Sequence, residues 1–217
     1  MQFQFFDPEA DIAVSARRLP HWEQARATYF ITFRTADSLP ESVLRAWRQE
    51  RDRWLRQHHI DPLADNWQDQ LRGLPAAAQH EFSNRFTRHW QELLDSGHGE
   101  CVLRRPELSQ IVARSLLHAD GDRYDLGDFV VMPNHVHLLV MFAGLRVMKL
   151  QCRSWKKFTA GEINLRLGRR GAFWQGESFD HLVRSEVQFE YLRSYIRENP
   201  AKAGLRVGEF HYYRRKD

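Results

Sequence analysis

Apolar and polar residues alternate in four short segments of the chain, and a two-residue period is typical of β-strands. Residues 28–34, "TYFITFR", place Tyr29, Ile31 and Phe33 on one face. After Gly121, "RYDLGDFVVM" and "HVHLLVMF" are predicted strands joined across "PN", a dipeptide that favours a turn. The fourth segment is "ESFDHLVR". We therefore expect an early strand, a β-hairpin in the second half and a short strand near the end.

Elsewhere the apolar residues recur every three or four positions, which predicts amphipathic helices. One helix starts near Ser38 and Pro40, and others cover about 76–94 and 106–119. A long helix follows the hairpin and ends near Gly168; its predicted apolar anchors are Val147, Leu150, Trp155, Phe158 and Ile163. Strands and helices in this order indicate an α+β fold. Residues 36–103 are interpreted as a helical insertion.

The last predicted helix begins at "SEVQ", where Ser185 and Gln188 form a capping-box pattern, and Pro200 is expected to end it after Asn199. Its core stripe is predicted to be Phe189, Leu192 and Ile196, which leaves Tyr191, Tyr195 and Asn199 one turn apart along the flank. A phenol and a carboxamide so placed can meet one substrate atom. The alternative is that Tyr195 lies at the edge of the core and Asn199 only ends the helix.

The composition predicts a globular protein with a sizeable core, since 42% of residues are hydrophobic, with seven Trp and 14 Phe. No segment approaches the roughly 20 apolar residues that span a bilayer, and acids replace the basic start of a signal peptide. We expect a cytoplasmic protein with no membrane partner. Cys101 and Cys152 lack metal or redox spacing.

Positive charge is concentrated at the end of the chain. Residues 143–217 carry 16 Lys and Arg against 8 Asp and Glu, and all five lysines lie there, whereas residues 1–142 carry 16 against 20. A basic segment suits a polyanion such as nucleic acid, because Lys and Arg neutralise phosphates and release counterions. A solvated basic face without a partner is the alternative.

The segment "VVMPNHVHLLVMF" contains two histidines one residue apart. On a strand, His135 and His137 share one face about 6.6–6.8 Å apart, within reach of one ion, while the other face is apolar. Two satisfied polar residues at a strand end are the simpler interpretation. Two ligands do not define a metal site, so a third must come from elsewhere in the chain.

The pair "MPNHVHLL" and, some 60 residues later, "YIRENPAKAGL" closely resembles the single-tyrosine HUH transposases of the insertion-sequence transposase family, most nearly the REP-associated branch. "SWKKFTAGEIN" and "FWQGESFDHLVR" resemble segments of the same family. The resemblance covers residues 27–34 and 105–207. It implies a single domain over 1–217 with a ferredoxin/RRM-like antiparallel sheet, helices on one face, and the insertion at about 36–103.

The resemblance further implies that His135, His137 and Asn199 bind a divalent metal, Mg²⁺ or Mn²⁺, and that Tyr195 is the nucleophile. Some relatives have Gln in place of Asn199, and both offer a carbonyl oxygen. The implied reaction is nicking and strand transfer of single-stranded DNA beside imperfect hairpins, in a bacterial cell, through a 5′-phosphotyrosine. No nucleotide cofactor is needed, in keeping with the absence of a G-x-x-x-x-G-K-[ST] motif. A homodimer is a possible state.

Six basic residues are predicted to bind DNA phosphates: Arg153, Lys156, Lys157, Arg184, Arg193 and Arg197. Trp155 or Trp174 would stack an unpaired base or pack in the core. Asp180 and His181 would orient a metal ligand or form a surface pair. Two rival functions are a domesticated protein that binds hairpins without cutting them, and a histidine-triad phosphohydrolase. The latter requires a third histidine where Leu139 stands.

Overall fold

The computed structural model describes residues 3–7, 13–16, 20–39, 41–64, 66–88, 98–176 and 178–216. The chain forms two compact units. One combines Met1–Ala36 with Glu100–Asp217, and the other is Asp37–Gly99. The bounds of the second unit lie close to those of the predicted insertion. Among the described residues, no helix has the length and apolar character needed to cross a membrane.

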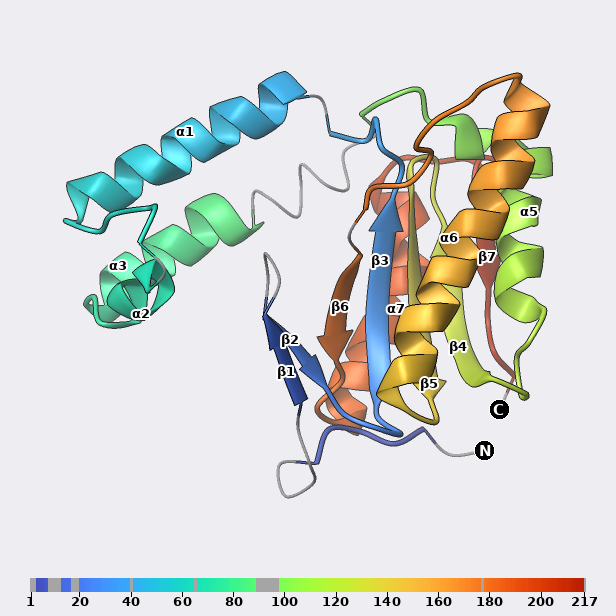
Figure 1. Cartoon of the computed structure of the whole chain (residues 1–217), viewed down its shortest axis with the longest axis horizontal. Helices are drawn as coiled ribbons and strands as arrows, with labels where there is room; N and C mark the ends of the chain where they lie inside the picture. Colours follow the sequence, from blue (N-terminus) through green and yellow to red (C-terminus); the bar gives the residue numbers. More distant parts are fainter. Residues whose placement is uncertain are drawn as a thin grey trace. The chain divides into compact units, whose positions relative to one another are not determined.

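The first unit is built on a five-stranded, entirely antiparallel sheet (Figure 1). Its strands, in spatial order, are β6 (Phe179–Leu182), β3 (Thr28–Arg34), β5 (His135–Phe142), β4 (Tyr124–Val131) and β7 (His211–Tyr213). Two further strands, β1 (Ala13–Ala16) and β2 (Pro20–Glu23), pair with each other. The four predicted strand segments are confirmed as β3, β4, β5 and β6. The sequence pattern did not predict β1, β2 or β7, which have three or four residues each.

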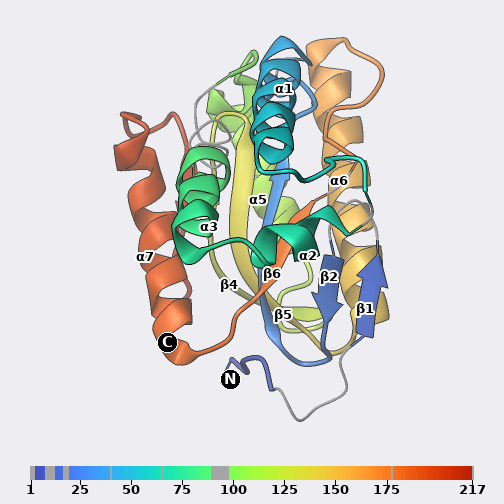
Figure 2. The ribbon, with the colours of Figure 1, turned by 90° about the vertical axis from the view of Figure 1, so that its left-hand side faces the viewer.

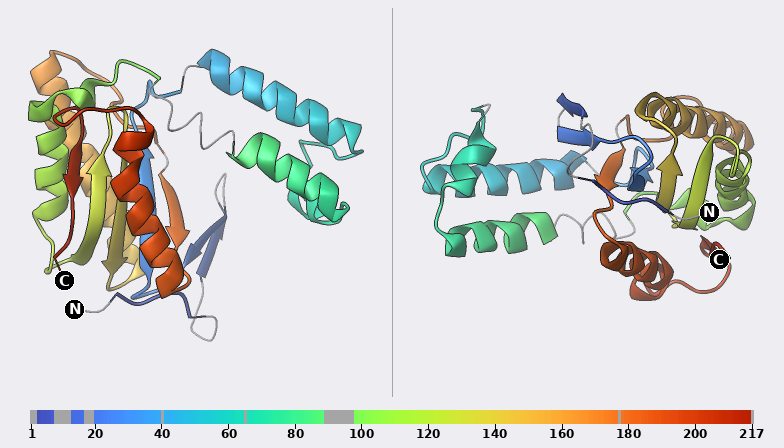
Figure 3. Two further views of the ribbon diagram at one scale, coloured as in Figure 1. Left: turned by 180° about the vertical axis from the view of Figure 1, so that it is seen from behind. Right: turned by 90° about the horizontal axis from the view of Figure 1, so that it is seen from below.

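Helices cover both faces of this sheet (Figures 2 and 3). On one face, α5 (Pro106–Leu117) and α6 (Leu145–Leu167) pack in a core that includes Leu116, Trp155, Ile31 and Leu138. On the other face, α7 (Glu186–Lys202) packs Phe189, Leu192 and Ile196 against Phe30, Val130 and Leu139. The α+β class with an antiparallel sheet is confirmed. The expected placement of helices on one face is wrong, because the strands carry apolar residues on both faces and each needs a cover.

Helix α6 ends as predicted, with Gly168 in the left-handed conformation at φ 64°. Two of its expected anchors are wrong, since Leu150 and Phe158 are 57% and 55% exposed. The predicted anchors Trp155 and Ile163 are confirmed, since both are buried. Apolar residues occur around most of the circumference of this helix. The spacing of three to four residues therefore did not identify the side that faces the sheet.

The capping box of α7 is confirmed. The Ser185 hydroxyl accepts a hydrogen bond from the Gln188 amide at 3.2 Å, and the Gln188 side chain accepts one from the Arg184 amide at 2.7 Å. The predicted end of the helix is wrong, because α7 continues through Pro200 to Lys202. Proline removes only its own N–H, and the bond from the Ala203 amide to the Asn199 carbonyl still forms beyond it.

The second unit is helical and has its own core. Its elements are α1 (Glu41–Gln57), α2 (Trp67–Arg72), α3 (Ala76–Phe82) and a π-helical segment, Ser83–Arg88, that continues α3. The core residues are Trp54, Leu55, Ile60, Phe82 and Phe86. The predicted helices near residues 41 and 76 are confirmed, and α2 was not predicted. Pro40 and residues 89–94 of the second predicted helix lie outside the described residues.

Candidate active site

The two histidines of the H-x-H motif lie side by side on β5, on the sheet face that α7 covers. His137 pairs with Thr32 of β3, and His135 pairs with Arg34. The alternation of the strand puts both imidazoles on one face, and their ring centroids are 4.6 Å apart. Both side chains are almost fully buried, at 1% and 2% exposure. The predicted sharing of one face is therefore confirmed, and that face is covered by protein.

Hydrogen bonds fix both rings through Nδ1. Nδ1 of His135 lies 2.7 Å from Oδ1 of Asn134, and Nδ1 of His137 lies 2.7 Å from the Thr32 hydroxyl. An amide oxygen only accepts, so Nδ1 of His135 carries the proton and donates it. In that tautomer the lone pair is on Nε2, which is buried in both rings. This arrangement orients imidazoles as a metal ligand requires.

Electrostatics keep His135 neutral. Burial is the largest cause that holds its pKa well below the usual value, and the neighbouring His137 and the Arg34 guanidinium act in the same direction. Neutral imidazole is the form that binds a metal ion.

Tyr195 of α7 lies against the histidine pair. Its ring centroid is 5.3 Å from that of His137 and 6.0 Å from that of Phe30, and both contacts are edge-on. Phe30 stacks on His137 at 5.3 Å. The ammonium group of Lys202 lies 5.9 Å from the centre of the Tyr195 ring. The fold thus brings the H-x-H strand and the tyrosine helix into direct contact.

Asn199 follows Tyr195 by one helical turn and is 4% exposed. Its backbone carbonyl accepts a hydrogen bond from the Ala203 amide. His181 has Phe30 as its register partner, and its Nε2 lies 2.8 Å from the Gln188 side-chain nitrogen. Burial and the charge of Arg184 lower the pKa of His181. Asp180 has Ile31 as its register partner.

The three predicted DNA-binding residues in and just before α7 differ in their surroundings. Arg184, just before the helix, is exposed. Arg197 is exposed and lies 3.4 Å from both Ser194 and Glu198. Arg193 is instead largely buried and forms an ion pair with Asp128. Arg184 and Arg197 therefore remain accessible to phosphate, whereas Arg193 is committed to the protein interior.

The three basic residues of α6 lie across the sheet from Tyr195, since α6 packs on the opposite face. Arg153 and Lys157 are exposed, and Lys156 donates to the carbonyls of Gln175 and Gly176. The structure thus divides the predicted DNA-binding residues between two sides of the sheet.

Trp155 and Trp174 are core residues, with exposures of 2% and 6%. Their indole N–H groups donate to the hydroxyls of Tyr124 and Thr159, at 3.3 Å and 2.8 Å. The core interpretation is confirmed for both, and the base-stacking interpretation is wrong, because their ring faces are covered by protein.

Several residues at the site were not singled out from the sequence: Phe30, Thr32, Arg34 and Lys202. Thr32 offers a signal in retrospect, since it is a hydroxyl on the face of β3 opposite Tyr29, Ile31 and Phe33. The sequence predicts Asn134 only as part of the turn. Among the described residues, no group of three or more His, Cys, Asp or Glu is placed to hold a metal ion.

No protein-family model matches the chain, and no curated protein matches it either. The chain is similar to a solved structure of a REP-associated tyrosine transposase bound to a REP hairpin. The two are 14% identical, the TM-score is 0.44, and the match covers 88% of this chain and 74% of that chain. At this level the likeness carries no weight for function.

Proposed function

We propose that the protein is a metal-dependent enzyme that nicks single-stranded DNA beside REP-like hairpins and transfers the strand through a 5′-phosphotyrosine. One observation carries this proposal. Tyr195 lies edge-on to His137, whose Nδ1 is held by Thr32 and whose ring lies 4.6 Å from that of His135. A phenol beside two oriented imidazoles supplies a nucleophile and two metal ligands in one place.

The donor set fits a divalent cation. His135 and His137 would bind it through Nε2, and Asn199 through its amide oxygen. Two nitrogens and one oxygen suit Mn²⁺, and Mg²⁺ accepts such a site when it also keeps oxygen ligands from phosphate and water. The chemistry that the ion supplies is neutralisation of the negative charge that builds on the scissile phosphate.

The proposed role of Tyr195 is in-line attack on the scissile phosphorus. The phenol loses its proton, a Tyr195–O–P bond forms, and the bond from phosphorus to the 3′ oxygen breaks. The leaving oxygen takes up a proton and becomes a free 3′-OH. The phosphodiester energy is kept in the phosphotyrosine, so a second 3′-OH can reverse the step and join the strand without a nucleotide cofactor.

The test is a denaturing gel of the protein mixed with labelled single-stranded DNA that carries an imperfect hairpin with flanking tetranucleotides. The reactions contain Mg²⁺, Mn²⁺ or EDTA. We expect a metal-dependent covalent protein–DNA band in the wild type. Tyr195→Phe should abolish it, because the ring stays and only the attacking oxygen is removed.

Tyr191→Phe is the matched control, since Tyr191 lies one turn earlier on α7 and is 67% exposed. It should leave the band unchanged. Loss of the band in both variants would contradict the role of Tyr195. Hairpin binding without a covalent band, across several hairpins, would leave the rival interpretation as a binding protein.

A further inference from the structure

Asp128 is a buried carboxylate that the proposed reaction does not use. It lies at a β-bulge in β4, where the register with β5 shifts between Leu126 and Phe129. Leu126 and Phe129 both join the core under α5 and α6, so the extra residue turns Asp128 to the α7 side of the sheet. The side chain is only 4% exposed.

Gly127 makes this bulge possible. A Cβ at this position would lie 2.9 Å from the Cβ of Leu139 on the neighbouring strand and 3.2 Å from its carbonyl oxygen. Only glycine fits against β5 at this distance. The bulge that carries the Asp128 carboxylate therefore depends on a glycine at position 127.

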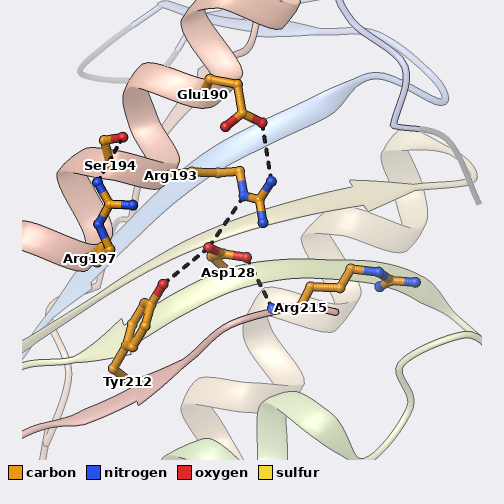
Figure 4. Close-up of polar contacts among 7 residues, drawn as sticks. All are labelled: Asp128, Glu190, Arg193, Ser194, Arg197, Tyr212 and Arg215. Atoms are coloured by element: carbon orange, nitrogen blue, oxygen red, sulfur yellow. Dashed lines mark hydrogen bonds and ion pairs between the residues drawn. The ribbon is translucent and has the colours of Figure 1, made fainter. Parts of the chain in front are cut away.

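Asp128 joins three segments of the chain (Figure 4). Its Oδ2 accepts from Nε of Arg193 on α7 at 3.4 Å and from the Tyr212 hydroxyl on β7 at 3.3 Å. Its Oδ1 accepts from the backbone N–H of Arg215 at 3.1 Å. Arg193 also contacts Glu190, whose side chain is 58% exposed. One carboxylate thus holds the helix, the edge strand and the C-terminal segment together.

The pKa values of Arg193 and Tyr212 are both shifted in the direction that these hydrogen bonds to Asp128 require. Burial by itself would lower the pKa of Arg193, but the Asp128 and Glu190 carboxylates outweigh it and raise that pKa. Burial, with the charge of Asp128, raises the pKa of Tyr212, so the phenol stays protonated and donates. The side chain of Arg193 is 16% exposed, which leaves little of it accessible to a phosphate.

We infer that Asp128 and Arg193 position α7 for the proposed reaction. Arg193 precedes Tyr195 by two residues and Asn199 by six, so the ion pair fixes the helix segment that carries the nucleophile and the third metal ligand. This replaces the phosphate-binding role expected for Arg193 from the sequence. The inference rests on the proposed function for its catalytic consequence, while the holding of α7 is a property of the fold alone.

The experiment has two readouts, applied to Asp128→Asn, Arg193→Met and the control Glu190→Gln. The first is amide hydrogen exchange along α7. We expect exchange over residues 192–199 to be about tenfold faster in the first two variants and unchanged in the control. The second is the rate of covalent complex formation at saturating hairpin DNA. We expect it to fall about tenfold to hundredfold, with DNA affinity, measured in EDTA, little changed.

The outcomes separate the possible roles. Unchanged exchange in both variants would overturn the inference, and so would a full covalent rate despite faster exchange. Weaker DNA binding with a normal rate at saturation would return Arg193 to a phosphate-binding role. If the wild type forms no covalent complex, the proposed function fails, and the exchange readout still decides whether Asp128 holds α7. If Asp128→Asn does not fold, Tyr212→Phe removes a single bond to the same carboxylate and should show the same changes to a smaller extent.

Discussion

Thr32 holds the ring of His137 from the neighbouring strand, and this single bond engages Nδ1, so that Nε2 is the proposed metal ligand. Thr32→Val keeps the shape of the side chain and removes the hydroxyl. We expect Mn²⁺ affinity, measured by calorimetric titration, to fall about 10- to 100-fold, the usual effect of removing a group that orients a ligand. Thr28→Val is the control, because the Thr28 hydroxyl on the same strand bonds to the Gln4 carbonyl instead. Equal Mn²⁺ affinities in the two variants would contradict this role.

The sequence revealed the site residues whose partners are close by along the chain. It did not reveal those whose partners are far away in the sequence. His135 and His137 are two residues apart on one strand, so strand alternation alone placed them together. Thr32 is separated from His137 by 105 residues, and Asp128 from Arg193 by 65. No local period links such pairs. Only the register of β3 with β5 and the packing of α7 bring them into contact.

Leu150 is exposed on one side of α6, whereas Ile163 is buried on the side that faces the sheet, so the two residues provide a matched test. Ile163→Ala should lower the free energy of unfolding by about 2–5 kcal/mol, because it leaves a cavity in the core. Leu150→Ala should change it by no more than about 0.5 kcal/mol, as at an ordinary surface position. Urea unfolding followed by circular dichroism measures both. A comparable loss in Leu150→Ala would mean that this face of α6 is covered in solution.

Replacing either of two glycines in regular elements by alanine should change the stability of the protein, in opposite directions for the two positions. A Cβ on Gly127 meets Leu139 in the β4 bulge, so Gly127→Ala should destabilise the protein by about 1–3 kcal/mol through overpacking. A Cβ on Gly161 in α6 meets nothing within 4 Å, so Gly161→Ala should stabilise it by about 0.4–1 kcal/mol. Thermal unfolding of the two variants decides the matter. Stabilisation by Gly127→Ala would show that the bulge is not closely packed.

At the scale of elements, the sequence predicted the strands and helices that have a long, clear period. The strand at 28–34, the hairpin and the long helix that ends at Gly168 are examples. It missed β7, "HYY", because three residues carry no measurable alternation. The sequence predicted that the last helix ends at Pro200, because it shows that proline lacks an N–H. It does not show that the Asn199 carbonyl accepts a hydrogen bond from Ala203 beyond the proline. It did not show the β4 bulge, which depends on the close approach of Leu139.

At the scale of the first unit, apolar residues on both faces of the sheet create two cores, and the candidate site lies in the smaller one, between the sheet and α7. The basic residues are divided in the same way. Arg197 is exposed on the helix that carries Tyr195, whereas Arg153 is exposed on α6 across the sheet. A DNA strand that reaches only the site would therefore meet the first arginine and not the second.

A short oligonucleotide tests this division. We expect Arg197→Gln to weaken binding of a single strand of about eight nucleotides. The slope of the logarithm of the binding constant against the logarithm of the salt concentration should become shallower by about 0.7, the value for one lost phosphate contact on single-stranded DNA. Arg153→Gln removes the same charge and should leave both quantities unchanged. Fluorescence anisotropy at several salt concentrations measures them. Equal effects of the two variants would mean that net charge governs binding, or that the strand also reaches α6. A smaller slope in Arg197→Gln alone would locate the phosphate path beside Tyr195, because the two variants have the same net charge and differ only in the side of the sheet that loses it.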